Sequence, residues 1–110
     1  MTPTVATDVL PAYRAYLDAC NERDWVTAQS FIRDPIRVQG VSTAAADYVK
    51  TIARLTSEHP GFVWTVGETV VQGERLAVRL RTPLGQEYAI YNWRDGQIVE
   101  YWGRGEAGVS

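Results

Sequence analysis

Apolar residues in the first half of the chain recur every three to four positions, as on the buried stripe of an amphipathic helix. This pattern predicts a helix over residues 7–22, which Thr7 or Asp8 can cap. A second, short helix is expected from about residue 25, with Ile32 turned inward. Pro35 should end it, because the residue before a proline is pushed away from helical geometry.

The period changes after that proline. Residues 36–39 alternate between apolar and polar side chains, which predicts a short strand that ends at Gly40. Apolar residues at helical spacing then predict a third helix over residues 43–58, closed by Pro60 and Gly61.

The second half of the chain favours strands, which we expect over residues 62–71, 75–82, 87–94 and 97–102. The gaps hold hairpin signals: Gln72-Gly73, a Pro-Leu-Gly sequence over residues 83–85, and Asp95-Gly96. Helices followed by an antiparallel meander predict one α+β domain over residues 1–110, with the helices packed on one face of a curved sheet.

Composition narrows the range of partners. The 110 residues carry a net charge of −2 without a basic run, so we expect neither nucleic acid nor an anionic membrane surface as a partner. One cysteine, Cys20, and one histidine, His59, favour neither a disulfide nor a metal site, and we expect no metal and no organic cofactor. No apolar run approaches the ~20 residues of a membrane span, and the N-terminus lacks signal-peptide features, so a cytoplasmic protein is expected.

Three segments resemble a known group of proteins. The closing hairpin DGQIVEYW (residues 95–102) is similar to that of the SnoaL-like polyketide cyclase group. YLDACNERDW (residues 16–25) is similar to the end of that group's first helix, and residues 76–79 to its central strand. The order of the predicted elements resembles the nuclear-transport-factor-two-like cone, which implies an open-ended cavity for an apolar ligand between helices and bent sheet. The cone hosts isomerases, cyclases, hydrolases and proteins without activity, so the resemblance implies a fold more strongly than a reaction.

The catalytic residues of three activities found on this cone do not carry over intact. The cyclases resemble proton-transfer enzymes with a histidine before the last turn, where Tyr91 stands here, and an aspartate after the final tryptophan, where Glu106 is the only nearby carboxylate. In a ketosteroid isomerase Tyr16 would be an oxyanion donor, but the position of the base falls near Gln39, which cannot take a proton. Arg79 matches the arginine of the Asp-Arg-Asp set of epoxide hydrolases, but Arg81 and Gly103 stand near the positions where the two aspartates would be needed.

A set of hydrogen-bond donors and aromatic residues remains. Tyr16, Gln39, Arg79 and Tyr91 are predicted donors, which would stabilise negative charge on a substrate oxygen. The predicted substrate-binding residues are all aromatic: Tyr13, Trp25, Tyr48, Trp64, Trp93 and Trp102. Core packing is the alternative for Tyr16, Trp64 and Trp102, and a solvated outer face is the alternative for Arg79.

Glu100 is a candidate acid on the closing strand. On a regular strand Ile98, Glu100 and Trp102 point one way, and Val99 and Tyr101 the other. Both faces are apolar, so we expect the helices to cover one and a second subunit the other, in a homodimer that pairs through the sheet. A buried carboxylate needs a partner or becomes protonated, so Glu100 either pairs with an arginine or lines the cavity as an acid.

Two functions stay open. The first is a cofactor-independent cyclase or isomerase of polyketide-like secondary metabolism, such as antibiotic biosynthesis, that positions a hydrophobic small molecule in an aromatic pocket. The second is a non-catalytic ligand-binding or dimerisation domain of the same fold. The absent histidine and aspartate favour the second function. The donors, the aromatic residues and the resemblance to a group dominated by cyclases favour the first.

Overall fold

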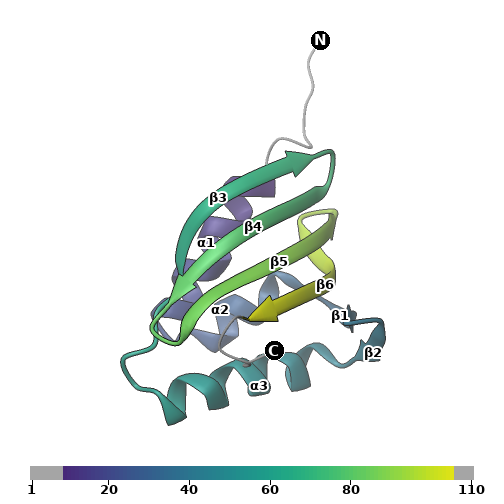
Figure 1. The fold of residues 1–110 in the computed structure, drawn as a ribbon. Helices are drawn as coiled ribbons and strands as arrows, with labels where there is room; N and C mark the ends of the chain where they lie inside the picture. The colour runs from purple at the N-terminus through teal and green to yellow at the C-terminus, as the bar shows by residue number, and fades with distance from the viewer. Residues whose placement is uncertain (1–8, 106–110) are drawn as a thin grey trace.

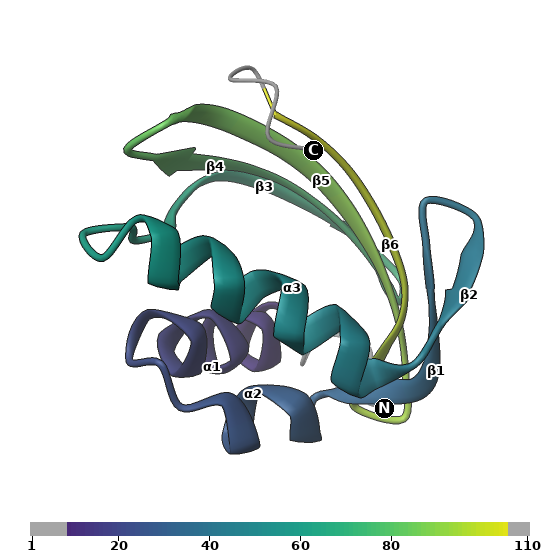
Figure 2. The same cartoon turned by 90° about the horizontal axis from the view of Figure 1, so that it is seen from below.

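Two long helices cover the concave face of a six-stranded sheet, and a short third helix packs against them, in the computed structural model, which describes residues 9–105 (Figures 1 and 2). The helices are α1 (Val9–Asn21), α2 (Trp25–Ser30) and α3 (Ala45–Glu58). The strands are β1 (Ile32–Val38), β2 (Val41–Thr43), β3 (Thr65–Gln72), β4 (Arg75–Thr82), β5 (Gly85–Arg94) and β6 (Gln97–Gly105). This arrangement confirms the predicted α+β class. Thr7, Asp8 and Glu106 lie outside the described residues.

The sheet combines the predicted meander with one parallel pair. Its strand order is β2-β1-β6-β5-β4-β3, and β1 runs parallel to β6 while every other neighbouring pair is antiparallel. Figure 2 shows the sheet curving over α1 and α3, which lie beneath it. The space between these layers holds the core and, toward α3, the cavity described below.

Burial follows the periods expected of helix and strand. In α1 the residues Tyr13, Tyr16 and Leu17 are buried at helical spacing. In β4 every second residue is buried, and Leu76 and Leu80 are 0% and 1% exposed. Each fully buried leucine contributes about 1.5–3 kcal/mol to folding, so Leu76 and Leu80 help to hold the sheet on the helices.

The expected end of the short helix is wrong. The helix α2 ends at Ser30, and Ile32 is the first residue of β1, buried beside Ile98 of β6. Pro35 therefore lies within a strand and does not end a helix. The register of β1 against β6 shifts between Ile32 and Arg37, and the proline, which has no N–H for a ladder bond, occupies that irregular stretch.

Two other boundaries also differ from the predictions. The segment 62–64 precedes β3 and is not part of it. The strand β2, which pairs with β1, has no counterpart among the predicted strands. Between β1 and β2 the turn residues Gln39 and Gly40 have φ angles of 51° and 85°, in the left-handed region that favours glycine.

A β-bulge in β6 changes the direction of its side chains. Trp93 of β5 pairs with Ile98, but the neighbouring Asn92 pairs with Glu100, so Val99 is an extra residue without a partner on β5. The alternation of side chains between the two faces of the sheet is therefore shifted by one residue after Val99.

As a consequence, Ile98 and Tyr101 both face the helices. Ile98 is fully buried, and the Tyr101 ring lies 5.7 Å from the ring of Tyr48 on α3, measured between centroids. Glu100 and Trp102 point to the convex face. The prediction that Ile98 and Glu100 share a face is wrong, because it assumed a strand without a bulge.

Candidate functional site

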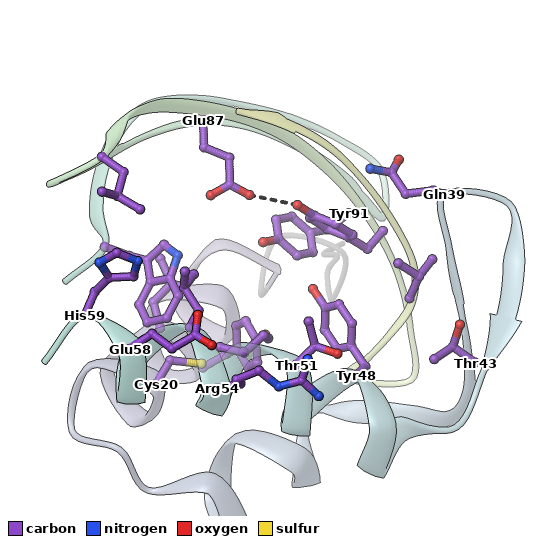
Figure 3. A pocket seen from close by; sticks show the side chains of 18 residues that line it. Cys20, Gln39, Thr43, Tyr48, Thr51, Arg54, Glu58, His59, Glu87 and Tyr91 are labelled. Atoms are coloured by element: carbon purple, nitrogen blue, oxygen red, sulfur yellow. Dashed lines mark hydrogen bonds between the residues drawn. The ribbon is translucent and has the colours of Figure 1, made fainter. Parts of the chain in front are cut away.

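A cavity of about 560 Å³ lies between the concave face of the sheet and helices α1 and α3 (Figure 3). This volume falls within the usual range of small-molecule pockets. Apolar side chains form much of the wall: Leu17, Val38, Ile52, Leu55, Trp64 and Leu84. Four residues of α3 and the segment after it line it with polar groups: Thr51, Arg54, Glu58 and His59. Because apolar side chains form much of the wall, the cavity suits a mainly hydrophobic molecule.

The helix α3 is held in place over this cavity by a side chain of β1. The N–H of Ala45, the first residue of α3, donates a hydrogen bond of 3.1 Å to Oδ1 of Asp34. Such a contact satisfies one of the backbone donors that a helix leaves free at its start.

A glutamate projects from the sheet into the cavity. Glu87 lies on the inward row of β5, two residues before the buried Ala89, and pairs with the buried Leu80 of β4. Its Oε2 accepts a hydrogen bond of 2.7 Å from the hydroxyl of Tyr101. Among the described residues, Glu87 is the only carboxylate that the sheet contributes to the cavity wall.

The surroundings of Glu87 favour its uncharged form. Burial raises the pKa of the Glu87 carboxyl above its usual value, and the hydrogen bond from Tyr101 opposes that increase. A carboxyl whose pKa is raised toward neutrality is suited to accept a proton from a substrate and to return it.

Tyr101, which donates to this carboxyl, belongs to a cluster of tyrosine rings that also contains Tyr48, Tyr91 and Tyr13. The Tyr91 ring lies 4.7 Å from the ring of Tyr13 and 5.2 Å from that of Tyr101, and the Tyr13 hydroxyl donates a 3.4 Å hydrogen bond to the Tyr91 hydroxyl. Figure 3 shows Tyr48 and Glu87 entering the cavity from opposite walls. Burial raises the pKa of Tyr48 and of Tyr91, so both hydroxyls stay protonated and can donate.

An asparagine holds the wall that carries Trp64. The Asn21 side chain, at the end of α1, accepts from the Trp64 N–H at 2.9 Å and donates to the Trp64 carbonyl at 3.0 Å. The Trp64 ring packs edge-on against Phe62, with ring centroids 4.7 Å apart. The two hydrogen bonds with Asn21 take the place of the hydrogen bonds to a neighbouring strand that segment 62–64 lacks.

Five of the eleven predicted site residues line the cavity: Tyr16, Gln39, Tyr48, Trp64 and Tyr91. The Gln39 amide, however, is bonded to the backbone of Gly103, donating from Nε2 to its carbonyl at 2.7 Å and accepting its N–H at 3.3 Å. The donor predicted at Gln39 therefore has an intramolecular acceptor.

Two predicted catalytic residues lie on the opposite face of the sheet. Arg79 points to the convex side, where its guanidinium lies 3.4 Å from the carboxylate of Glu68. Glu100 accepts hydrogen bonds from the Asn92 side chain at 2.7 Å and from the Trp102 indole at 2.8 Å. The prediction that Arg79 serves the cavity is wrong, because it is on the outward row of β4. Both alternatives offered for Glu100 are also wrong, because the bulge turns it outward to an amide and an indole.

Four predicted aromatic contacts are absent from the cavity wall. Tyr13 and Trp93 belong to the core and are 0% and 3% exposed, and Trp25 of α2 is partly buried against that core. Trp102 is on the convex face and is 44% exposed. These predictions are wrong because the residue type does not fix which side of a helix or strand each aromatic ring occupies.

Glu87 and Tyr101 are the two residues that the sequence predictions missed. Residues 87, 89, 91 and 93 alternate along β5, so the row that holds Tyr91 also holds Glu87. That spacing could have indicated Glu87 once Tyr91 was placed inward. No comparable local signal indicates Tyr101, because its direction depends on the bulge at Val99.

No group of three or more His, Cys, Asp or Glu side chains in residues 9–105 is placed to hold a metal ion. None of the helices described there has both the length and the apolar character needed to cross a membrane.

No protein-family model and no curated protein matches this sequence, but solved structures match the fold. A SnoaL-like polyketide cyclase from Agrobacterium tumefaciens is 18% identical, with a TM-score of 0.82 over 97% of this chain and 96% of that one. IdmH from Streptomyces antibioticus, proposed to be a polyketide cyclase, is 18% identical, with a TM-score of 0.75 over 94% and 93%. A proposed ketosteroid isomerase from Kribbella flavida is 24% identical, with a TM-score of 0.68 over 84% and 73%. The fold is therefore the SnoaL-like, nuclear-transport-factor-two-like fold.

Proposed function

We propose that this protein is a cofactor-independent cyclase or isomerase that moves a proton on a hydrophobic carbonyl compound, with Glu87 as the base. The observation that carries the proposal is a carboxyl on the inner wall of an apolar cavity, oriented by one tyrosine and facing others. The standard histidine and aspartate of the cyclases are not needed for this chemistry, because Glu87 supplies a proton acceptor from a different position of β5.

The proposed reaction begins at the free oxygen of the carboxyl. Oε2 of Glu87 is occupied by Tyr101, which leaves Oε1 to remove a proton from the carbon next to the substrate carbonyl. The C–H electron pair becomes the C=C bond of an enolate, and the negative charge moves to the oxygen. The hydroxyls of Tyr91 and Tyr48 can donate to that oxygen, and such donors typically contribute about 10²–10³ in rate each.

The enolate then has two outcomes, which separate an isomerase from a cyclase. Glu87 returns the proton to another carbon of the conjugated system, which moves a double bond. Alternatively, the enolate carbon attacks a second carbonyl of the same molecule, a C–C bond forms, and the proton goes to the new alkoxide. The apolar wall favours the second outcome for a flexible chain, because a hydrophobic cavity holds it in a folded shape.

Exchange of hydrogen for deuterium tests the proposal without knowledge of the natural substrate. A bicyclic ketone such as 2-tetralone, incubated with the protein in D₂O, should gain deuterium at the carbon next to its carbonyl, as measured by ¹H NMR. Glu87→Gln should lower the enzyme-dependent rate by about 10²–10⁴, the usual contribution of a general base. Glu68→Gln, which removes an acid on the convex face, is the matched control and should keep the wild-type rate.

Binding distinguishes the second candidate function. Quenching of tryptophan fluorescence by the same ketone reports occupancy of the cavity, since Trp64 lines it. Binding without deuterium exchange above the rate in the absence of protein, for this ketone and for flexible 1,3-diketones, would contradict the enzyme and support a ligand-binding domain.

A further inference from the structure

The Tyr101 ring reaches Glu87 by lying along the surface of the sheet. The two residues belong to neighbouring strands, and the register places Ala89 and Gly103 between them, as partners in the next row. Both are small. The ring can therefore extend over this row toward the carboxyl.

Gly103 is the position where the space is needed. A Cβ atom built there would overlap the hydroxyl oxygen and the Cζ atom of Tyr101. Any side chain at this position would require the ring to leave its place beside the sheet, and the hydroxyl would then lose Glu87. The rings of Tyr48 and Tyr91, 5.7 and 5.2 Å away, limit where the displaced ring can go.

Gln39 holds the backbone on which the ring lies. Its backbone N–H donates to the Tyr101 carbonyl at 2.9 Å, and its side-chain amide makes two hydrogen bonds to the N–H and carbonyl of Gly103. The side chain thus extends the pairing of β6 beyond the last residue of β1, Val38. Gln39 also has a φ angle of 51°, a conformation that a residue with a side chain rarely adopts unless its surroundings hold it.

We propose that Gly103 and Gln39 are positioning residues: Gly103 provides the space for the Tyr101 ring, and the Gln39 amide fixes Gly103, so that the Tyr101 hydroxyl stays on Glu87. This inference rests on the proposed function only for the statement that Glu87 is the catalytic base. The contacts themselves are independent of any substrate.

The titration of Glu87, followed by ¹³C NMR of its side-chain carboxyl, tests this role without substrate. A hydrogen bond from Tyr101 stabilises the carboxylate, so its loss in Tyr101→Phe should raise the midpoint of the Glu87 titration. Gly103→Ala and Gln39→Ala should raise it in the same direction. Gly103→Ala should add nothing in the Tyr101→Phe background, because the hydroxyl that it displaces is already absent.

Two controls match the variants. Gly61→Ala places a methyl group where no atom lies within 4 Å, and Gln29→Ala removes an exposed amide of α2, so neither should move the midpoint. A Gly103→Ala protein that loses thermal stability but titrates Glu87 like the wild type would overturn the proposal, as would an unchanged midpoint in Tyr101→Phe. If Gly103→Ala does not fold, an unchanged midpoint in Gln39→Ala overturns it equally. Deuterium exchange is measured separately, so failure of the base and failure of the positioning role are distinguishable.

Discussion

The hydroxyl of Tyr101 donates a 2.7 Å hydrogen bond to Oε2 of Glu87, fourteen residues earlier in the chain and on the neighbouring strand. This contact gives a partly buried carboxyl its one protein donor among the described residues. Burial favours the protonated carboxyl and the hydrogen bond favours the carboxylate, and burial is the larger of the two effects. Glu87 therefore couples the stability of the fold to pH.

The stability of the protein should depend on pH through Glu87. Because its pKa is higher in the folded than in the unfolded protein, the group's contribution is fully present below the unfolded value of about 4.3 and is lost as pH rises through the folded value. Relative to Glu87→Gln, the wild type should become less stable as pH rises from about 4 through the folded pKa of Glu87. Urea denaturation of both proteins across that range measures the difference. A difference that grows with pH in favour of the wild type would contradict the raised pKa.

The same carboxyl should control the pH dependence of proton exchange. A base must be ionised to accept a proton, so the rate of deuterium incorporation into a bound ketone should rise with pH through the folded pKa of Glu87 and then level off. In Tyr101→Phe that rise should move to higher pH, because the carboxylate has lost its donor. The exchange rate, measured at saturating ketone, checks both statements. A rise that stays in place in Tyr101→Phe would separate the hydrogen bond from the reaction.

Tyr91 should act as a donor and not as a packing residue alone. Tyr91→Phe keeps the ring that contacts Tyr13 and Tyr101 but removes the hydroxyl, so the exchange rate should fall by about 10²–10³ with little change in binding of the ketone. Tyr88→Phe, on the exposed row of the same strand, is the matched control and should leave the rate unchanged. Equal rates in both variants would remove Tyr91 from the site.

The fold could be predicted largely because its signals are local. The stripe that carries Tyr13 and Tyr16 in α1, and hairpin turns such as Asp95-Gly96, depend on residues a few positions apart. The positive φ angle of Asp95, 54°, is the conformation that such a turn requires. The helices α1 and α3 and the antiparallel meander followed from these signals, but β2 and the parallel pairing of β1 with β6 did not.

The site was less predictable, because it depends on contacts between strands. No residue in the sequence around Val99 indicates the bulge. The bulge nevertheless directs Glu100 to the convex face and Tyr101 to the concave face of the sheet. On β5, the row with Glu87 and the row with Tyr88 each mix polar and apolar residues, so the pattern does not say which faces the helices. Gly103 matters only because the Tyr101 ring lies beside it. Contacts of this kind, between residues on neighbouring strands, can be identified only when the pairing register of the strands is known.

The link between Asn21 and Trp64 should stabilise the cavity wall. Asn21→Ala leaves the Trp64 N–H and carbonyl without their partner, which should lower the free energy of unfolding by about 1–3 kcal/mol. Asn21→Asp keeps an acceptor for the N–H but faces the carbonyl with a second oxygen, so it should also be destabilising. Urea denaturation gives the change for both variants. The exposed Asp18→Ala on the same helix is the control, and an Asn21→Ala protein as stable as this control would contradict the link.

The convex face of the sheet should form a homodimer interface. Four large apolar side chains on β3, β5 and β6 remain exposed there: Val70 (66%), Tyr88 (45%), Ile90 (37%) and Trp102 (44%). The ion pair of Arg79 with Glu68 lies beside these side chains. Two copies related by a two-fold axis can therefore present opposite charges to each other. Sedimentation should show a dimer for the wild type and a monomer for Trp102→Lys, while Val26→Lys, at an 85% exposed position of α2, should stay dimeric. A wild-type protein that sediments as a monomer at micromolar concentration would contradict this interface, and the convex side chains would then be free for a different partner.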